Sequence, residues 1–179
     1  GRYGLFVGRL VPEKRLDLLL RAWAEARPGW PLAVAGDWWD AACRRRCEGL
    51  FAPAGARMLG PVFGEELGSL YAHAGMVVQP SVLEGASLVL LEAAARGRCV
   101  VATDLPENRS VLGENALYCQ GEERTQLVDA IRRCVKQEEL RDRLGPAAQQ
   151  RVTEQFSVRR TAREYAHLYA GLVRYCEGP

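Results

Sequence analysis

The sequence predicts an α/β fold, a Rossmann-like, doubly wound and mostly parallel sheet with helices on both faces. Three observations support this prediction. Short apolar runs of strand type alternate with helical patterns along the whole chain. Roughly ten to twenty residues separate successive strands, which is enough for a helix that crosses over to a parallel neighbour. The length of 179 residues and the hydrophobic content of 48% are sufficient for one core.

The first strand and the first helix have the clearest patterns. Residues 3–7, YGLFV, are an apolar run of the kind that forms a buried strand. After the loop GRLVPEKR, Leu16, Leu20 and Trp23 recur at helical spacing. Asp17 lies in the first turn of this helix, where a negative charge is stabilised by the helix dipole. We therefore expect a strand, a loop and a helix in this order.

The rest of the chain repeats this alternation. Short runs rich in Val, Ala and Leu predict further strands at residues 31–36, 56–60, 75–80, 99–103 and 116–119. Helical patterns predict helices at residues 40–50, 65–73, from 88, at 123–135, 138–155 and 157–176. The sequence LPEN, residues 105–108, is interpreted as a turn. Since no internal repeat or linker divides the chain, we expect one domain over residues 1–179.

Charge and composition exclude several classes of protein. The 24 Lys and Arg residues nearly balance 22 Asp and Glu residues, so the net charge of +2 gives no general affinity for nucleic acid. The six cysteines lack the spacing of zinc ligands and are interpreted as reduced thiols. No apolar run approaches the ~20 residues of a transmembrane helix. We expect a cytoplasmic protein without a metal site. A strand that begins so near Gly1 also suggests a fragment cut at a domain boundary.

The predicted fold also predicts the position of a ligand. Doubly wound sheets bind ligands in the crevice outside the carboxyl ends of their strands. The loop after the first strand carries Gly8, Arg9 and Lys14, and the loop after residue 80 carries Glu84 and Gly85. Because the carboxyl ends of parallel strands meet at one edge, we expect these two loops to converge there.

Anion binding is the chemistry that this edge suits. The small residues 85–87 precede the helix that begins near Leu88, so backbone N–H groups are accessible at a positive helix end. Arg9 offers a planar fork of donors, and Lys14 offers a point charge, a combination that fits a diphosphate. A third loop, residues 104–108, is expected at the same edge. The sequence therefore predicts a phosphate site between these loops.

Two carboxylates accompany the predicted phosphate site. Glu84 lies in the second loop, and Glu92 lies about a turn and a half into an otherwise apolar helix. A carboxylate buried in a core is costly unless it has a partner. Glu92 therefore either lies on a solvent-facing stripe or contacts a ligand, and both interpretations are open on the residues alone. Ionised carboxylates accept hydrogen bonds from vicinal hydroxyls such as those of ribose and hexose.

Five segments together resemble the C-terminal domain of retaining glycosyltransferases of family 4. They are GRLVPEK, PSVLEG, the E-x₇-E spacing from Glu84 to Glu92, LLEAAARGRCVVATDLPENRSVLGENALYC and QQRVTEQFS. The likeness runs over nearly the whole chain in the correct order. It implies the GT-B fold, in which two Rossmann-like domains face each other across a cleft. The C-terminal domain of such an enzyme binds the nucleotide-sugar donor without a metal ion, and the N-terminal acceptor domain is a partner absent from this chain.

The resemblance implies a role for each candidate residue. Arg9 and Lys14 would hold the donor diphosphate, and Glu84 would hold hydroxyls of the transferred sugar, which makes these three the candidate catalytic residues. Glu92 would hold the ribose diol, and Val62 would lie near the nucleobase. The full donor-binding set is Gly8, Arg9, Lys14, Val62, Glu84, Gly85, Ala86, Ser87, Leu88 and Glu92. The implied reaction moves a sugar from a UDP- or GDP-sugar to an acceptor, with retention, in polysaccharide or glycolipid synthesis. Membrane contact would then come through the full-length protein.

The sequence departs from the family pattern at several positions. Arg15 stands where the family commonly has glycine, Ala86 and Ser87 replace a frequent Phe-Gly, and Ser110 stands where many relatives have glutamate. These departures keep a second hypothesis open, a degenerate or non-catalytic module that binds nucleotide-sugars. A third is half of a nucleotide-sugar epimerase, which would need a further titratable residue in the crevice.

Three further expectations concern turnover, the acids near the site and a pair of tryptophans. A half-site cannot hold two substrates in attack geometry, so we expect donor binding without appreciable turnover. Asp104 and Glu107 are the further acids that an epimerase could use. Trp38 and Trp39 follow Gly36 in an unusual position for tryptophan, and they either anchor the core or form a wall of the cleft.

Overall fold

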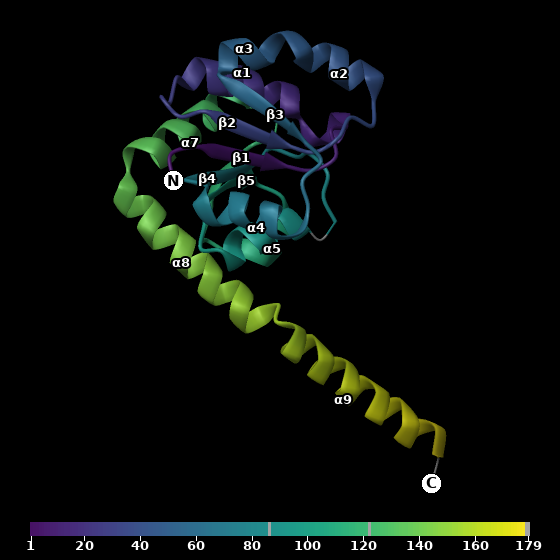
Figure 1. The fold of residues 1–179 in the computed structure, drawn as a ribbon. Helices are drawn as coiled ribbons and strands as arrows, with labels where there is room; N and C mark the ends of the chain where they lie inside the picture. The colour runs from purple at the N-terminus through teal and green to yellow at the C-terminus, as the bar shows by residue number, and fades with distance from the viewer. Residues whose placement is uncertain (86, 122, 178–179) are drawn as a thin grey trace.

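The computed structural model describes residues 1–85, 87–121 and 123–177. Its sheet has six strands in the order β3-β2-β1-β4-β5-β6. The strands are β1 Gly4–Val7, β2 Leu32–Ala35, β3 Ala56–Gly60, β4 Met76–Gln79, β5 Val100–Thr103 and β6 Leu117–Cys119. Every pairing between neighbours is parallel. The strand order reverses between β1 and β4, which defines the switch point of a Rossmann-like sheet. The predicted fold class is confirmed (Figure 1).

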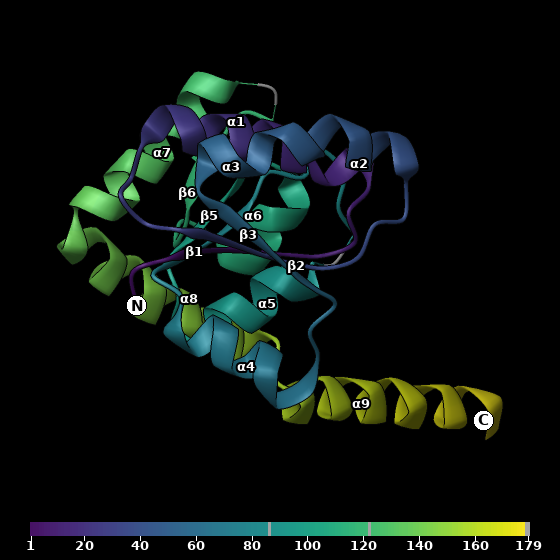
Figure 2. The same cartoon turned by 45° about the horizontal axis from the view of Figure 1, so that its top comes forward.

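Helices cover both faces of the sheet (Figures 1 and 2). The first face carries α1 Leu16–Ala26, α2 Ala41–Cys47, α3 Phe51–Ala54 and α7 Arg124–Lys136. The second face carries α4 Gly64–His73, α5 Leu88–Ala95, α6 Pro106–Leu112 and α8 Glu138–Gln155. Two 3-10 helices, η1 Pro12–Lys14 and η2 Glu48–Leu50, are single turns in the connections. The helix predicted at residues 40–50 is therefore divided into α2 and η2, and α3 follows directly after it.

The core explains why the strands read as continuous apolar runs. Successive side chains of a strand point to opposite faces. Phe6 and Val78 thus belong to the cluster under α1 and α7, whereas Leu5 and Val77 belong to the cluster under α4 and α5. All four side chains are fully buried. Since helices cover both faces, neither face needs polar residues, as expected for a parallel sheet.

The turn predicted at residues 105–108 was wrong, because these residues begin α6. Pro106 occupies the first turn, where its fixed φ suits a helix, and Glu107 favours the positive helix end. Asn108 is fully buried, and its side-chain amide donates a hydrogen bond of 2.8 Å to the carbonyl oxygen of Thr103. This bond ties α6 to the end of β5. The residues Pro and Asn favour turns in isolation, and the burial of the following Val111 selects the helix instead.

The last helix, α9 Val158–Glu177, extends away from the sheet (Figures 1 and 2). Tyr165, Leu168, Tyr169 and Leu172 recur along it at the spacing of one helix face. Between 51% and 61% of each of these side chains is exposed. The described chain therefore leaves an apolar stripe of α9 open to solvent.

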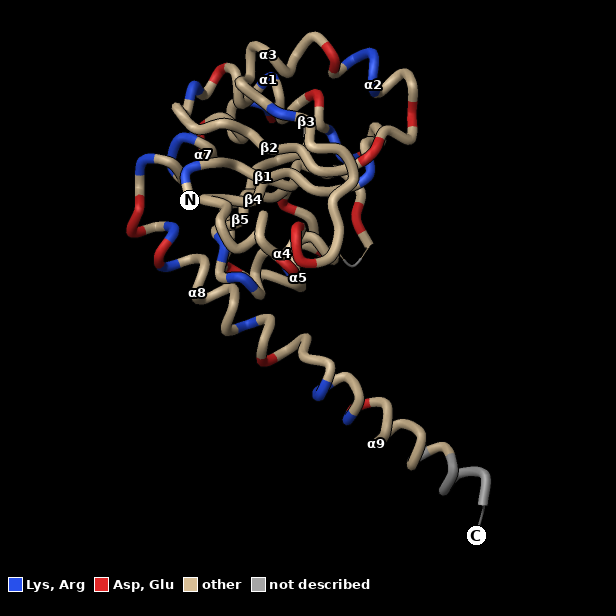
Figure 3. Tube along the Cα trace, in the orientation of Figure 1, with Lys and Arg blue, Asp and Glu red and all other residues tan. Residues whose placement is uncertain are grey.

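Charged residues are distributed without a long stretch of one sign. Figure 3 shows Lys and Arg interspersed with Asp and Glu along the trace. Among the described residues, no helix combines the length and the apolar character needed to cross a bilayer. Cysteine thiols that are free and buried are those of Cys43, Cys47, Cys99, Cys119 and Cys134.

Candidate functional site

The two predicted site loops meet at the switch point of the sheet. β1 and β4 are paired, with Gly4 opposite Met76, so the loops that follow them leave the same edge side by side. The backbone N–H of Val82 donates a hydrogen bond of 2.9 Å to the carbonyl oxygen of Glu13. This bond joins the loop after β4 directly to the loop after β1. The convergence expected from the sequence is present.

The loop after β1 depends on an unusual backbone conformation. Gly8 has φ +149°, a value that side chains rarely adopt, and its N–H donates to the carbonyl oxygen of Ala35 at 3.0 Å. Arg15, which closes the loop, has φ +53° and ψ +39°, in the left-handed region. A residue other than glycine loses about 1 kcal/mol there. The glycine that the family commonly has at this position thus has a conformational explanation, and Arg15 departs from it at a local cost.

Lys14 and Glu84 form a part-buried ion pair in the site. Lys14 Nζ lies 2.8 Å from Glu84 Oε1, and the two side chains are 15% and 6% exposed. Gln79 Nε2 donates a second hydrogen bond, of 3.1 Å, to the same oxygen. Burial raises the pKa of Glu84, but hydrogen bonds from Lys14, Ser81 and Gln79 outweigh it, and the pKa is lowered overall. Glu84 is therefore ionised at neutral pH and accepts hydrogen bonds only.

Arg9 lies at the exposed mouth of the same loop. Its guanidinium carbon is 5.4 Å from the centroid of the Trp39 ring, a cation–π contact. Trp39 is 69% exposed, whereas Trp38 packs edge-on against Phe51 with the ring centroids 6.4 Å apart. The core interpretation therefore applies to Trp38 but not to Trp39. Trp38 packs against the core, and Trp39 is exposed next to Arg9, so a role of Trp39 as a cleft wall stays a prediction.

Glu92 lies on the exposed side of α5. Burial first, and the neighbouring Glu92 carboxylate second, raise the pKa of the Tyr71 hydroxyl above its usual range. Tyr71 Oη is buried, and the Glu92 carboxylate acts on it as a hydrogen-bond acceptor, although no described atom reaches normal hydrogen-bond geometry with it. Exposure fits both a solvent-facing stripe and a ligand contact, so the ribose contact of Glu92 stays a prediction.

The remaining donor-binding candidates surround the pair at different distances along the edge. Ser87 is the N-cap residue of α5 and is 5% exposed, while Leu88 begins the helix and is 68% exposed. A Cβ atom at Gly85 would meet open space, so the backbone is accessible there. Val62 follows β3, two strands away from β1. The prediction for Ala86 falls outside the described residues.

Two site residues were missed in the sequence. Gln79 ends β4 and Ser81 follows it, and both are fully buried. The available signal was a polar residue at the end of the apolar run MVVQ.

Asp104, a candidate acid for an epimerase, is instead paired with Arg109 at 2.5 Å, and this hydrogen bond lowers its pKa. Such a carboxylate is a poor proton donor, which gives the epimerase hypothesis no support.

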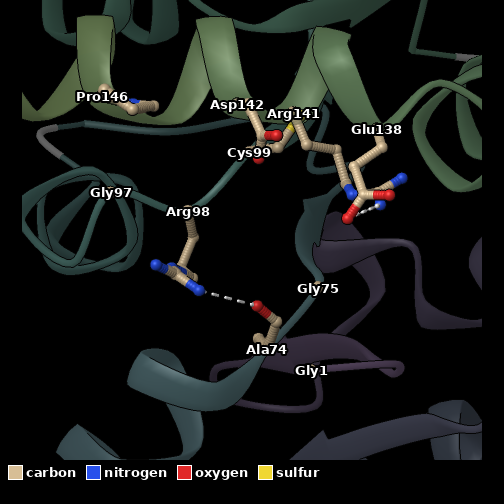
Figure 4. Close-up of a pocket in the computed structure, with 10 residues that line it drawn as sticks. All are labelled: Gly1, Ala74, Gly75, Gly97, Arg98, Cys99, Glu138, Arg141, Asp142 and Pro146. Atoms are coloured by element: carbon tan, nitrogen blue, oxygen red, sulfur yellow. Dashed lines mark hydrogen bonds and ion pairs between the residues drawn. The ribbon is translucent and has the colours of Figure 1, made fainter.

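A pocket lies at the opposite edge of the sheet. It is a pocket of about 400 Å³ beside the amino ends of three strands, where Gly1, Gly75 and Cys99 precede β1, β4 and β5. Figure 4 shows Arg98 at its edge, hydrogen-bonded to the carbonyl oxygen of Ala74. None of the predicted donor-binding residues lines it. This pocket is therefore distinct from the predicted site at the carboxyl ends.

Comparison of the sequence with known proteins identifies relatives over most of the chain. The family model described as glycosyl transferases group 1 matches residues 2–151. A D-inositol 3-phosphate glycosyltransferase from Corynebacterium urealyticum is 32% identical over 180 residues, which cover 93% of this chain and 42% of that protein. The chain spans less than half the length of the curated relatives that it matches.

Comparison of the structure with solved structures identifies proteins with a similar fold. HepE from Anabaena, in complex with UDP-glucose, superposes with a TM-score of 0.86 at 19% identity, over 96% of this chain and 49% of that one. A sucrose-phosphate synthase from Thermosynechococcus elongatus gives 0.83 at 27% identity, over 97% and 46%. These similarities show that the chain has the Rossmann-like fold found in GT-B glycosyltransferases.

Proposed function

This chain belongs to the group 1 glycosyltransferases, and we propose that it is the donor-binding domain of an enzyme that transfers a sugar from a nucleoside diphosphate sugar with retention. The Lys14–Glu84 pair carries this proposal. It places a cation suited to a diphosphate beside a carboxylate suited to sugar hydroxyls. Both come from the loops at the switch point, where ligands of such sheets bind.

The proposed residues suit the charges that develop in glycosyl transfer. Negative charge builds on the departing diphosphate, and preorganised donors aimed at it stabilise the transition state. Lys14, Arg9 and the first N–H groups of α5 would supply these donors, while Glu84 would orient the sugar through its hydroxyls. Arg9 is exposed and Lys14 is nearly buried, so we propose that the diphosphate meets Arg9 first.

Nucleotide titration tests the proposal. We expect one of UDP, GDP and ADP to bind the chain in isothermal calorimetry, with affinity unaffected by EDTA, because the proposed contacts need no metal. Arg9→Ala removes one charged donor and should weaken binding by roughly tenfold to a hundredfold. Glu92→Ala should also weaken it, by the loss of the ribose contact.

Arg44→Ala serves as the matched control for Arg9→Ala. Arg44 is an exposed arginine of α2 whose partner is Glu48, so its loss should leave nucleotide affinity unchanged. Equal affinities of the Arg9→Ala and unsubstituted chains would contradict the phosphate contact. Absence of nucleotide binding by the full-length protein would contradict the donor site as a whole. Appreciable sugar transfer by this chain alone would contradict its role as half of an active site.

We also propose that α9 contacts the acceptor domain of the same protein, because its apolar stripe is open in this chain. The variant Leu168→Gln/Leu172→Gln should leave the melting temperature of the chain unchanged, since both side chains are already more than half exposed. It should reduce self-association, measured by light scattering after gel filtration.

The same two substitutions should lower the stability of the full-length protein. Arg163→Gln, on the opposite side of α9, is the control and should affect neither property. A full-length protein that tolerates the double substitution without loss of stability would rule out this contact.

A further inference from the structure

The Lys14–Glu84 pair creates a difficulty for the proposed site. Lys14 lies against Glu84 at 2.8 Å, yet it is also the cation proposed for the donor diphosphate. A lysine that turns toward phosphate oxygens leaves Glu84 without its counter-ion. The Glu84 side chain is only 6% exposed, so water cannot replace the lysine freely. An unpartnered buried carboxylate is strongly unfavourable, and either it gains a proton or other groups hold it.

Gln79 is placed to hold the Glu84 carboxylate. Its Nε2 donates to Glu84 Oε1 at 3.1 Å and to Ser81 Oγ at 3.1 Å. An amide nitrogen carries two hydrogens, so both bonds can be made together. Gln79 is the last residue of β4 and is paired in register with Ala102 of β5, which anchors its backbone in the sheet. The donor to Glu84 thus comes from the strand, whereas Lys14 comes from a loop.

The amide oxygen of Gln79 shows that a glutamine at this position has an energetic cost. Gln79 is fully buried, and its Oε1 has no hydrogen-bond partner among the described residues. A buried acceptor without a partner is unfavourable, and leucine in the same place would avoid it. The residues before Gln79 in β4 are apolar. Packing therefore gives no reason for an amide here, whereas the bond to Glu84 does.

We propose that Gln79 is a positioning residue, which holds the Glu84 carboxylate when Lys14 turns to the phosphates of a nucleoside diphosphate sugar. This inference rests on the proposed function. The contact by which Gln79 holds Glu84, called the clamp below, can nevertheless be tested without a ligand. Gln79 does not contact the reacting atoms in this scheme. It keeps Glu84 in the charged form, which can accept hydrogen bonds from sugar hydroxyls.

The groups around Glu84 define the expected pH behaviour. Of the described groups that act on the carboxylate, Lys14 is the charged one, and Ser81 and Gln79 are neutral donors. Burial raises the pKa of Glu84, and these three groups together lower it. Loss of Lys14 alone leaves two donors. Loss of Lys14 and Gln79 leaves burial opposed by Ser81 alone, so the pKa should rise much further.

Carbon-13 NMR of the Glu84 carboxyl group tests the clamp in the ligand-free chain. Lys14→Met imitates a lysine that has left the pair. We expect the titration midpoint of Glu84 in Lys14→Met/Gln79→Leu to lie roughly one pH unit or more above that in Lys14→Met. Thr103→Val, added to Lys14→Met, is the control. It removes a buried hydroxyl at the end of the neighbouring strand and should cause no further shift. Equal midpoints with and without Gln79 would overturn the inference.

Calorimetry with whichever of UDP, GDP and ADP binds the chain, in buffers of different ionisation enthalpy, tests the clamp during binding. At mildly acidic pH the terminal phosphate of the nucleotide also exchanges protons on binding, so the unsubstituted chain serves as the reference. Gln79→Leu should take up as much as about one proton more than the unsubstituted chain for each nucleotide bound, because Glu84 is protonated when Lys14 leaves it. Nucleotide binding with the same proton uptake in both chains would overturn the inference and leave the proposed function intact. Failure of UDP, GDP and ADP alike to bind would count against the proposed function, and the ligand-free titration would still decide the role of Gln79.

Discussion

Lys14→Met should lower the free energy of unfolding of this chain by about 3 kcal/mol, because it leaves the Glu84 carboxylate buried without a counter-ion. Methionine is unbranched like lysine and fills a similar volume, so lost packing contributes little. The expected effect lies at the lower end of the range for broken buried pairs. Gln79 still donates to the carboxylate, and Ser81 still helps to lower its pKa. Urea denaturation followed by circular dichroism gives the measurement.

The double variant Lys14→Met/Glu84→Gln should regain more than half of this loss. A neutral amide has no counter-ion to lose, and its carbonyl oxygen can still accept from Gln79. Arg44→Gln is the control for a surface pair. Its partner is Glu48, both side chains are more than half exposed, and the expected change is within about 0.5 kcal/mol. A double variant as unstable as Lys14→Met would show that the cost lies in packing and not in the unpaired charge.

The effect of Lys14→Met should also depend on pH. The pKa of Glu84 is lowered in the folded chain, so its pairing contributes full stability above the ordinary value of 4.5 and loses this contribution as the pH falls below it. Lys14→Met raises the folded pKa and removes this contribution. The stability difference between the two proteins should therefore be largest near neutral pH and shrink under acid conditions. A constant difference at all pH values would argue against an electrostatic origin.

The fold could be predicted from the sequence because its signals are local. Apolar runs of strand length and helical spacing of Leu16, Leu20 and Trp23 are visible in short windows, and right-handed crossovers then restrict the topology. The convergence of the two site loops follows from that topology alone. The turn prediction at residues 105–108 was wrong for the opposite reason. The turn preference of Pro106 and Asn108 is local, but the burial that makes α6 is decided by the rest of the fold.

The contacts within the site could not be predicted in the same way. Lys14 and Glu84 are 70 residues apart, and their bond depends on strand register and on the side-chain conformations. Gln79 lies inside the strand predicted at residues 75–80, and a single polar residue near a strand end has several explanations. Trp38 and Trp39 illustrate the same limit, since neighbouring residues of an extended segment point in different directions. The sequence allowed a core position or a cleft position for each tryptophan but did not distinguish between them.

Gly36→Ala is expected to damage the site and the fold together. Gly36 has φ +155°, and a Cβ atom built on it would lie 1.9 Å from the carbonyl oxygen of Gly8. This neighbour is backbone, so it cannot move aside without moving the loop that carries Arg9 and Lys14. The hydrogen bond from the Gly8 N–H to the carbonyl oxygen of Ala35 would be strained by the same displacement. Overpacking and an unfavourable φ together should cost about 3 kcal/mol or more.

Gly29→Ala separates the two parts of this cost. Gly29 has φ +73°, and nothing lies within 4 Å of a Cβ atom there, so its substitution should cost only the roughly 1 kcal/mol of a left-handed alanine. Urea denaturation of both variants gives the difference that belongs to the contact with Gly8. Calorimetry with the nucleotide that binds the unsubstituted chain gives the effect on the site. Gly36→Ala should bind it much more weakly, because the phosphate loop is displaced, whereas Gly29→Ala should bind it normally. Equal losses of stability in the two variants, with nucleotide affinity retained in both, would mean that the loop after β2 does not hold the loop after β1 in its binding conformation.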